Sequence, residues 1–397
     1  MEKDEKIKNV QFAVGFFAAV LLISILGGVF FLLSLPYQEE TSLEHIETAL
    51  SADANATTPT ASPVYPVQEE RLANPPEIIR AVYLTGMSAG STRKIQYILD
   101  LAKHTTMNAV VIDIKDFSGL ISYPAHIPDV NALVKKLHES NLYVIGRITV
   151  FQDPVLAKAR PDITIHSKAG QDALWLDNKG LAWMDPASSE TWDYNIAIAK
   201  DAARRGFDEI NFDYVRFPSD GDLEDMIFPV YDESVAKSEV IKEFFAYLSS
   251  ALADTKISVD LFGLSTVKLD DLGIGQKIED AYGNFDYVSP MVYPSHYADG
   301  FLGFKKPAEK PYEVVEYSLL HALLRLTKFE QNATEQGIQY RPTRIRPWLQ
   351  DFTIRGVEYD EAKVHAQIKA TKDALGESFA GYMLWNPQNI YTKSAID

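Results

Sequence analysis

Apolar residues follow two alternating patterns from about residue 78 to the end of the chain. Short apolar runs are typical of buried strands, and segments with apolar residues three or four positions apart, which lie between them, are typical of helices. The predicted strands cover residues 79–86, 109–115, 143–150, 209–217, 256–264, 286–293, 344–350 and 381–385. Residues 151–186, after the third strand, show no clear pattern and are predicted to be a long loop.

Strands that alternate with helices predict a parallel sheet. Eight is the number of strands that closes a (β/α)8 barrel, or TIM barrel, and such a barrel typically takes about 250 residues. An open doubly wound sheet is the alternative, but it usually carries a glycine-rich phosphate turn after its first strand. The turn Gly86-Met-Ser-Ala-Gly90 does not match that motif. We therefore expect an α/β fold with a TIM barrel over residues 78–397.

The N-terminal region has a different pattern. Residues 10–35 are nearly all apolar and carry no charge, and this run is longer than the roughly 20 residues that span a bilayer. Lysines precede it, so the positive-inside rule predicts that residues 1–9 are cytoplasmic and that the barrel lies outside the membrane. A cleaved signal peptide is the alternative, although its apolar region usually has about 7–15 residues. Residues 36–77 are rich in Ala, Thr, Ser and Pro and are predicted to be a disordered linker.

Composition narrows the function classes. The net charge of −17 argues against a nucleic-acid binder, which would carry a basic patch or stripe. The chain has no cysteine, which excludes disulfides, Fe–S clusters, thiol catalysis and Cys-based zinc sites. No metal-ligand spacing, P-loop or nucleophile elbow is visible, so we predict that no metal or cofactor is needed.

The stretch 206–218 reads as a buried strand with a carboxylate near its C-terminal end. Because side chains alternate along a strand, Ile210 and Phe212 share an apolar face, and Asn211 and Asp213 share the opposite face. TIM-barrel enzymes place their chemistry at the C-terminal ends of the strands, which makes Asp213 a candidate catalytic residue. A structural ion pair between Asp213 and Arg216 is the competing interpretation.

Polar and aromatic side chains also occupy the inward positions near the ends of the other strands. This mixture suits sugars, because carboxylates accept hydrogen bonds from hydroxyls and aromatic rings stack on apolar sugar faces. The residues are Asp113, Lys115, Arg147, Asn211, Asp260, Tyr293, Trp348 and Trp385, with His296, Asp351 and Asn386 in the loops that follow.

Cleavage of a glycosidic bond needs two carboxyl groups. One donates a proton to the leaving oxygen, and the other attacks the anomeric carbon or activates a water that does so. Asp213 and Asp260 are expected at equivalent heights on adjacent strands and form the preferred pair. Asp351, across the barrel, is the alternative partner. Either Asp260 or Asp351 could instead form an ion pair in the barrel core, and the stereochemistry of cleavage is left open.

Several segments together resemble one known family. Gly206-Phe-Asp-Glu-Ile-Asn-Phe-Asp-Tyr-Val-Arg-Phe-Pro218 resembles the signature of the DUF4015 family of bacterial glycoside hydrolases, and residues 79–86, 108–116, 144–154, 290–294, 346–352 and 381–386 also fit. The resemblance covers about residues 78–397 and implies a TIM barrel of the glycosidase superfamily. The fourth strand is also similar to the nucleophile strand of α-amylase-like enzymes, which implies that Asp213 is the nucleophile. Those enzymes carry a Glu on strand five, where this chain has Asp260.

The sequence therefore predicts a membrane-anchored, extracytoplasmic glycoside hydrolase that acts on a cell-wall or other extracellular polysaccharide. Asp213 is expected to be the nucleophile or base, and Asp260 or Asp351 the acid. The residues expected to line the sugar site are Asp113, Lys115, Arg147, Asn211, Arg216, Tyr293, His296, Trp348, Trp385 and Asn386. The alternative is a carbohydrate-binding barrel without hydrolytic activity that serves as a cell-wall attachment or scaffold protein.

Overall fold

The computed structural model describes residues 70–170, 173–354 and 356–396. The predicted membrane segment 10–35 and the linker up to residue 69 lie outside these ranges. Within the described ranges, no helix combines the length and the apolar character needed to cross a membrane.

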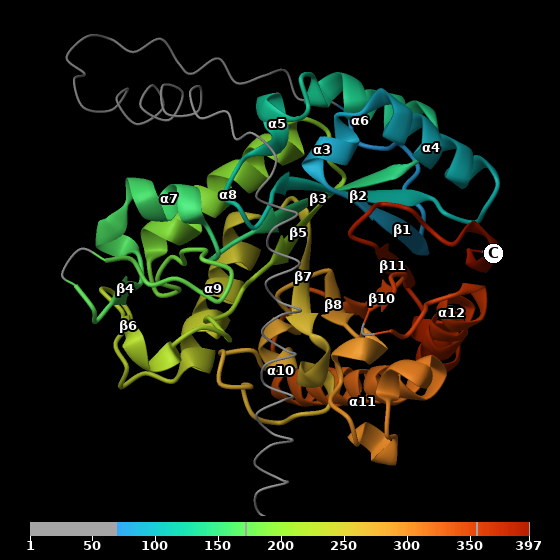
Figure 1. The fold of residues 1–397 in the computed structure, drawn as a ribbon. Coiled ribbons are helices and arrows are strands. Elements are labelled where there is room, and N and C mark those ends of the chain that lie inside the picture. The colour runs from blue at the N-terminus through green and yellow to red at the C-terminus, as the bar shows by residue number, and fades with distance from the viewer. Residues whose placement is uncertain (1–69, 171–172, 355, 397) are drawn as a thin grey trace, which may run out of the picture. The chain divides into compact units, whose positions relative to one another are not determined.

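Parallel strands close into a barrel (Figure 1). Around the barrel they are β1 (Ile79–Leu84), β2 (Ala109–Lys115), β3 (Tyr143–Thr149), β5 (Glu209–Asp213), β7 (Lys256–Phe262), β8 (Tyr287–Met291), β9 (Arg344–Ile345) with β10 (Trp348–Gln350), and β11 (Gly381–Trp385). The pairing of β8 with β10 and of β11 with β1 completes the ring. The predicted eight-stranded (β/α)8 barrel is confirmed.

The seventh barrel strand is divided into β9 and β10, although the sequence predicts one strand over 344–350. Pro347 lies at the break, and proline has no N–H to donate to a neighbouring strand. Its carbonyl still accepts from the Met383 N–H at 2.9 Å, so the two short pieces follow one path.

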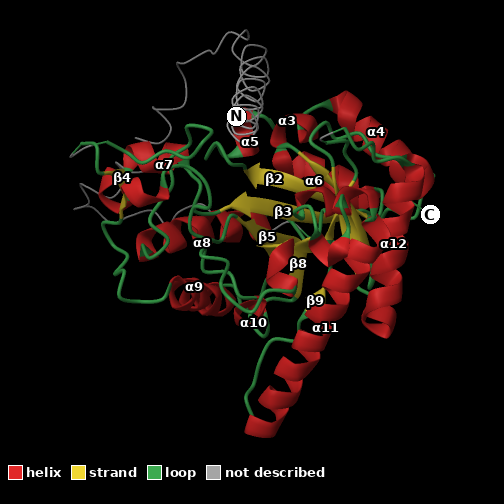
Figure 2. Ribbon diagram, turned by 60° about the horizontal axis from the view of Figure 1, so that its bottom comes forward, coloured by secondary structure: helices red, strands yellow, loops and turns green. Residues whose placement is uncertain are grey.

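Helices surround the strands (Figure 2). Several begin at a side chain that accepts from a backbone N–H of the first turn, which satisfies a donor left unpaired at a helix start. The longer helices are α4 (Thr92–Lys103), α6 (Val130–Glu139), α8 (Ser189–Arg204), α9 (Lys237–Ala251), α11 (Pro311–Gln336) and α12 (Glu361–Leu375). The short ones are α3 (Gly86–Ala89), α5 (Ser122–Ala125), α7 (Pro154–Ala159) and α10 (Ile278–Ala281).

Two apolar clusters hold these layers together. Outward strand residues such as Ile112 and Phe212 pack against the helices in the larger cluster. Inward residues such as Ala81, Val111 and Met383 fill part of the barrel interior. Fully burying one aliphatic or aromatic side chain contributes about 1.5–3 kcal/mol, so these clusters supply the main driving force for the fold. The polar inward residues described below therefore sit in a rigid frame.

The connection after β3 contains regular structure where the sequence predicts a loop. It includes α7 and β4 (His166–Ser167), and β4 pairs antiparallel with β6 (Met226–Ile227) from the connection after β5. Figure 1 shows α7, β4 and β6 together beside the barrel. Trp175 and Trp183 anchor this region, because both are buried and both indole N–H groups donate hydrogen bonds within it.

The contacts of the barrel begin before residue 78. The Leu72 N–H donates to Asp208 Oδ1 at 2.7 Å, and the Leu72 side chain packs against the interior apolar cluster. Asp208 immediately precedes β5, so this segment is attached at the N-terminal ends of the strands. The C-terminal ends, where Asp213 lies, are at the opposite end of the barrel.

Candidate active site

Arg147 on β3 gathers three carboxylates near the C-terminal ends of the strands. Its Nη1 donates to Asp113 Oδ1 at 2.6 Å, and its Nη2 donates to Asp213 Oδ2 at 2.5 Å. Its Nε lies 3.7 Å from Asp260 Oδ2. The register of the sheet sets this arrangement, because Asp113, Arg147 and Asn211 are opposite one another on β2, β3 and β5. One guanidinium thus faces three acids from three strands.

Asp213 lies at the last position of β5, and a change in backbone direction follows it. Tyr214 has a φ of 53°, in the left-handed region that non-glycine residues rarely adopt. This turn directs the Tyr214 N–H onto Asp213 Oδ1 at 2.6 Å. Strained backbone of this kind is concentrated at functional sites. It also ends the strand alternation, so Val215 is buried among apolar residues.

Asp260 on β7 is the deeper acid, with only 1% of its surface exposed. Asn211 Nδ2 donates to its Oδ1 at 2.8 Å. Its Oδ2 has no partner within hydrogen-bond distance among the described residues, but the Trp348 side chain is near enough to the carboxyl to oppose the rise in its pKa. Burial raises the pKa of Asp260 well above its ordinary value, and the nearby Asp213 charge raises it further, against the opposing effect of Arg147.

Asp113 is bound on both sides. The Tyr83 hydroxyl donates to its Oδ2 at 2.5 Å while Arg147 holds its Oδ1. Burial raises the pKa of Asp113, and both partners oppose that rise. Burial also raises the pKa of Tyr83, which keeps the phenol as a donor. Sequence reasoning missed Tyr83, although its place at the inward end of β1 was a usable signal.

Aromatic rings line one side of the cluster. The Tyr293 and Trp385 ring centres are 5.9 Å apart, and Phe352 meets Trp385 edge-on at 4.9 Å. Trp348 meets Tyr83 edge-on at 6.4 Å. Burial raises the pKa of Tyr293, and the charges of Asp260 and Asp213 add to that rise, which places this ring beside the carboxylates. Trp385 is partly exposed and therefore available to a ligand.

His296 lies at the outer edge of this aromatic group. Its ring centre is 5.1 Å from that of Tyr293, and its side chain is exposed. The structure thus brings together Asp113, Arg147, Asn211, Asp213, Asp260, Tyr293, Trp348 and Trp385, with His296 at the edge.

Lys115 is not part of the cluster, and the expectation that it shares the inward face with Asp113 is corrected. A bulge in β2 shifts the register, so that Asp113 faces Arg147 whereas Lys115 faces Ile148, a residue of the outer apolar cluster. A shift of one residue turns a side chain to the other face of a sheet. Lys115 Nζ donates instead to Asp153 at 2.6 Å, with both side chains inaccessible to solvent.

Asp351 also lies outside the cluster. The Thr392 N–H and hydroxyl donate to its two carboxylate oxygens at 2.8 and 2.7 Å. β10 ends at Gln350, so the carboxylate no longer follows the inward alternation and holds the C-terminal segment instead. Burial raises the pKa of Asp351 despite these bonds. Asn386 also bonds nearby backbone groups, because its amide donates to the Asp351 carbonyl and accepts from the Gln388 N–H.

Arg216 is not the ion-pair partner of Asp213; among the described residues that partner is Arg147. The Arg216 guanidinium lies 4.8 Å from the ring centres of Trp183 and Phe262, and it donates to the Phe217 carbonyl at 3.0 Å. Burial lowers its pKa. Arg216 therefore supports the wall next to Asp213.

A second buried ion pair lies deeper in the barrel, and sequence reasoning missed it. Both Arg346 Nη groups donate to Glu209, and neither side chain is exposed. Ser258 Oγ also donates to Glu209, at 2.5 Å, and the Tyr287 ring lies 4.1 Å from the guanidinium. Glu209 shares the inward alternation of Asn211 and Asp213 but lies at the start of β5, so the same pattern of alternation could have identified it.

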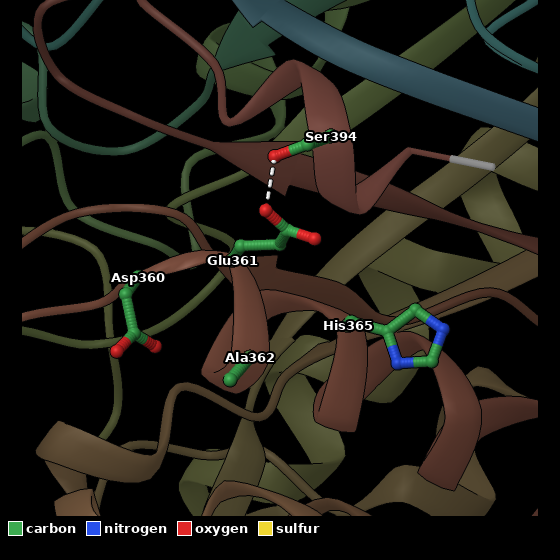
Figure 3. A pocket seen from close by; sticks show the side chains of 5 residues that line it. All are labelled: Asp360, Glu361, Ala362, His365 and Ser394. Atoms are coloured by element: carbon green, nitrogen blue, oxygen red, sulfur yellow. Dashed lines mark hydrogen bonds between the residues drawn. The ribbon is translucent and has the colours of Figure 1, made fainter.

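A separate pocket lies away from the acid cluster. The pocket in Figure 3 is lined by Asp360, Glu361, Ala362, His365 and Ser394 at the start of α12. Its acids are already engaged, because Asp360 caps the helix and Glu361 accepts from the Ser394 hydroxyl at 2.7 Å. Over the residues that the structure describes, no group of three or more His, Asp or Glu side chains is placed to hold a metal ion.

The closed parallel barrel carries a cluster of acids near the C-terminal ends of its strands, and burial raises the pKa of two of them, Asp113 and Asp260. This is the position where TIM-barrel enzymes place their active sites. The chain belongs to the DUF4015 family, described as "Putative glycosyl hydrolase domain", which matches residues 81–391. This confirms the family resemblance read from the sequence. A comparison with curated proteins finds no significant match.

The chain is similar to several solved structures. A hypothetical protein from Ruminiclostridium thermocellum ATCC 27405 is 38% identical over 49% of this chain and 98% of its own, with a TM-score of 0.41. The glycoside hydrolase domain of PgaB (BpsB) from Bordetella bronchiseptica is 14% identical over 79% of this chain and 95% of that domain, with a TM-score of 0.55. The α-galactosidase TtGalA from Thermus thermophilus is 13% identical over 80% of this chain and 60% of its own, with a TM-score of 0.49. The PgaB likeness supports the barrel architecture alone.

Proposed function

We propose that the protein is a glycoside hydrolase in which Asp213 and Asp260 are the paired carboxyl groups. The observation that carries this proposal is that one guanidinium, that of Arg147, faces both acids on adjacent strands at the C-terminal ends of the barrel. Family membership supports the same reaction class.

In this proposal Asp260 supplies the proton. It protonates the glycosidic oxygen as the bond from that oxygen to the anomeric carbon breaks. Asp213 either forms a bond to the anomeric carbon, which water later hydrolyses, or removes a proton from the water that attacks directly. The raised pKa of Asp260 favours the acid role, because a carboxyl group that keeps its proton at higher pH can donate it there.

The proposed substrate is a cell-wall or other extracellular polysaccharide. Trp385 is a partly exposed ring backed by the buried rings of Tyr293 and Phe352, and it suits the apolar face of a sugar ring. The proposed location is the outer side of the cell membrane, with residues 10–35 as the anchor and the N-terminus in the cytoplasm.

The test measures reducing-end release by the full-length chain from a panel of wall and storage polysaccharides. Turnover should vanish in Asp213→Asn and Asp260→Asn, with each variant folded, and should persist in the matched variant Asp351→Asn. Binding without turnover in the unmutated protein would favour the scaffold alternative. Equal turnover in Asp213→Asn and the unmutated protein would contradict the assignment of Asp213.

A further inference from the structure

A continuous path of hydrogen bonds connects the deep Glu209–Arg346 pair to Asp260. Ser258 Oγ donates to Glu209 Oε1 at 2.5 Å. Asn211 Nδ2 donates both to Ser258 Oγ at 3.0 Å and to Asp260 Oδ1 at 2.8 Å. Glu209, Ser258 and Asn211 are completely inaccessible to solvent, and Asp260 is almost so. The path therefore runs through the solvent-inaccessible interior of the barrel along β5 and β7.

Glu209 determines the direction of every bond on this path. A carboxylate paired with arginine has lone pairs only, so the Ser258 hydroxyl must donate to it. The Ser258 oxygen is then left to accept, and the Asn211 amide is the group placed to donate to it. The amide nitrogen must therefore point toward Ser258 and Asp260, and the amide oxygen away from them. Among the described residues that oxygen has no hydrogen-bond partner.

We infer that Ser258 and Asn211 are positioning residues that fix which oxygen of Asp260 carries its proton. Oδ1 always receives the Asn211 N–H, so the exchangeable proton resides on Oδ2. Oδ2 is the oxygen that faces the Arg147 Nε at 3.7 Å and has no partner within hydrogen-bond distance in the described part of the chain. The catalytic consequence, a proton held on Oδ2 and not on Oδ1 when Asp260 donates it, rests on the proposed function; the hydrogen-bond direction does not.

Ser289 on β8 provides a matched control. It stands opposite Asp260 in the sheet register, and it is as fully buried as Ser258. Its hydroxyl has no hydrogen-bond partner among the described residues. Replacing it by alanine removes the same atom from the barrel interior but leaves the path from Glu209 to Asp260 intact.

The experiment follows the titration of Asp260 by NMR in the full-length chain carrying 13C-labelled aspartate, with Asp260→Asn used for assignment. Ser258→Ala frees the Asn211 amide to turn its oxygen toward the protonated acid, so the titration should move to higher pH. The ratio of protonated to ionised Asp260 at a given pH should rise about tenfold. Ser289→Ala should leave the titration unchanged, and Ser258→Thr, which keeps the hydroxyl, should restore it.

An unchanged titration in Ser258→Ala, or equal shifts in Ser258→Ala and Ser289→Ala, would overturn the inference. If Ser258→Ala does not fold, Asn211→Ala should give the upward shift, because it removes the donor to ionised Asp260. The titration needs no substrate, so the two hypotheses fail separately. If Asp213→Asn loses turnover but Ser258→Ala does not shift the titration of Asp260, the positioning role alone is refuted. If Ser258→Ala shifts the titration but the unmutated protein shows no turnover, the hydrolase proposal alone is refuted.

Discussion

The two buried arginines of the barrel interior have opposite surroundings. Arg346 meets one carboxylate, Glu209, and that carboxylate also accepts from Ser258. Arg147 meets three carboxylates, one of which has an oxygen with no partner within hydrogen-bond distance among the described residues. The deep pair has one charge of each sign and is inaccessible to solvent, whereas the upper cluster has more carboxylates than guanidinium groups and reaches the strand ends.

This difference separates a structural role from a chemical one. A balanced pair with its oxygens satisfied offsets the cost of burying its charges. An unbalanced group of acids is unfavourable for stability, because like charges oppose ionisation of one another, and it shifts the pKa of its members. Such shifted groups are concentrated at active sites. The comparison therefore favours a structural role for Glu209 and Arg346, and it supports the proposal that Asp213 and Asp260 carry the chemistry.

The largest expected effect comes from breaking the deep pair. Arg346→Met leaves the Glu209 charge buried without compensation and should cost about 3–5 kcal/mol in the free energy of unfolding. Urea denaturation measures this loss. The double variant Arg346→Met with Glu209→Gln carries no uncompensated charge and should recover much of the stability. Equal losses in the single and double variants would show that the ion pair is not the cause.

At Asp260 we expect a smaller effect of opposite sign, a gain in the free energy of unfolding when the acid is removed. Because its pKa is raised in the folded protein, the folded state holds a proton that the unfolded chain releases, and stability falls as pH rises from the ordinary carboxylate range through the raised pKa. Asp260→Asn has no such dependence and should be more stable above that range, by about 0.5–2 kcal/mol. Unfolding measured across pH checks this. A constant difference between the two proteins at all pH values would contradict the burial of an unfavourable charge.

The smallest predicted effect concerns the aromatic side of the site. Trp385→Ala removes a partly exposed ring beside Tyr293 and Phe352, so KM for a cleaved polysaccharide should rise about five- to tenfold, with kcat less affected. Steady-state kinetics measures both constants. Trp385→Phe keeps a ring and should retain most of the affinity. A fall in kcat at unchanged KM would place Trp385 in the chemistry rather than in binding.

The sequence predicted the barrel well because its signal, apolar periodicity, is local. The bounds of β2 and β11 were predicted to the residue. Side-chain direction was less secure, since it requires an unbroken strand. A bulge in β2 reversed Lys115, and the end of β10 released Asp351 from the inward face. Neither β2 nor β10 contains a proline or glycine from which the interruption could have been predicted.

The deep pair was missed for another reason. Glu209 and Arg346 occupy inward positions that strand alternation identifies, but only the strand ends were read for chemistry. Their partnership joins residues far apart in sequence, and only the closed barrel brings β5 and β9–β10 to face each other. A barrel interior has more than one polar layer, and the sequence alone does not say which layer is catalytic.

The most direct test of this account compares two acid-to-amide variants, Glu209→Gln and Asp213→Asn, in both stability and turnover. Asp213→Asn should lose turnover by about 100- to 10,000-fold with no loss of stability. Glu209→Gln should lose about 3–5 kcal/mol of stability, and the turnover of its folded molecules should fall by no more than about tenfold, the change expected if the hydrogen-bond path to Asp260 loses its direction. A stability loss confined to Asp213→Asn, with turnover lost in folded Glu209→Gln, would reverse the roles of the two layers and contradict the account.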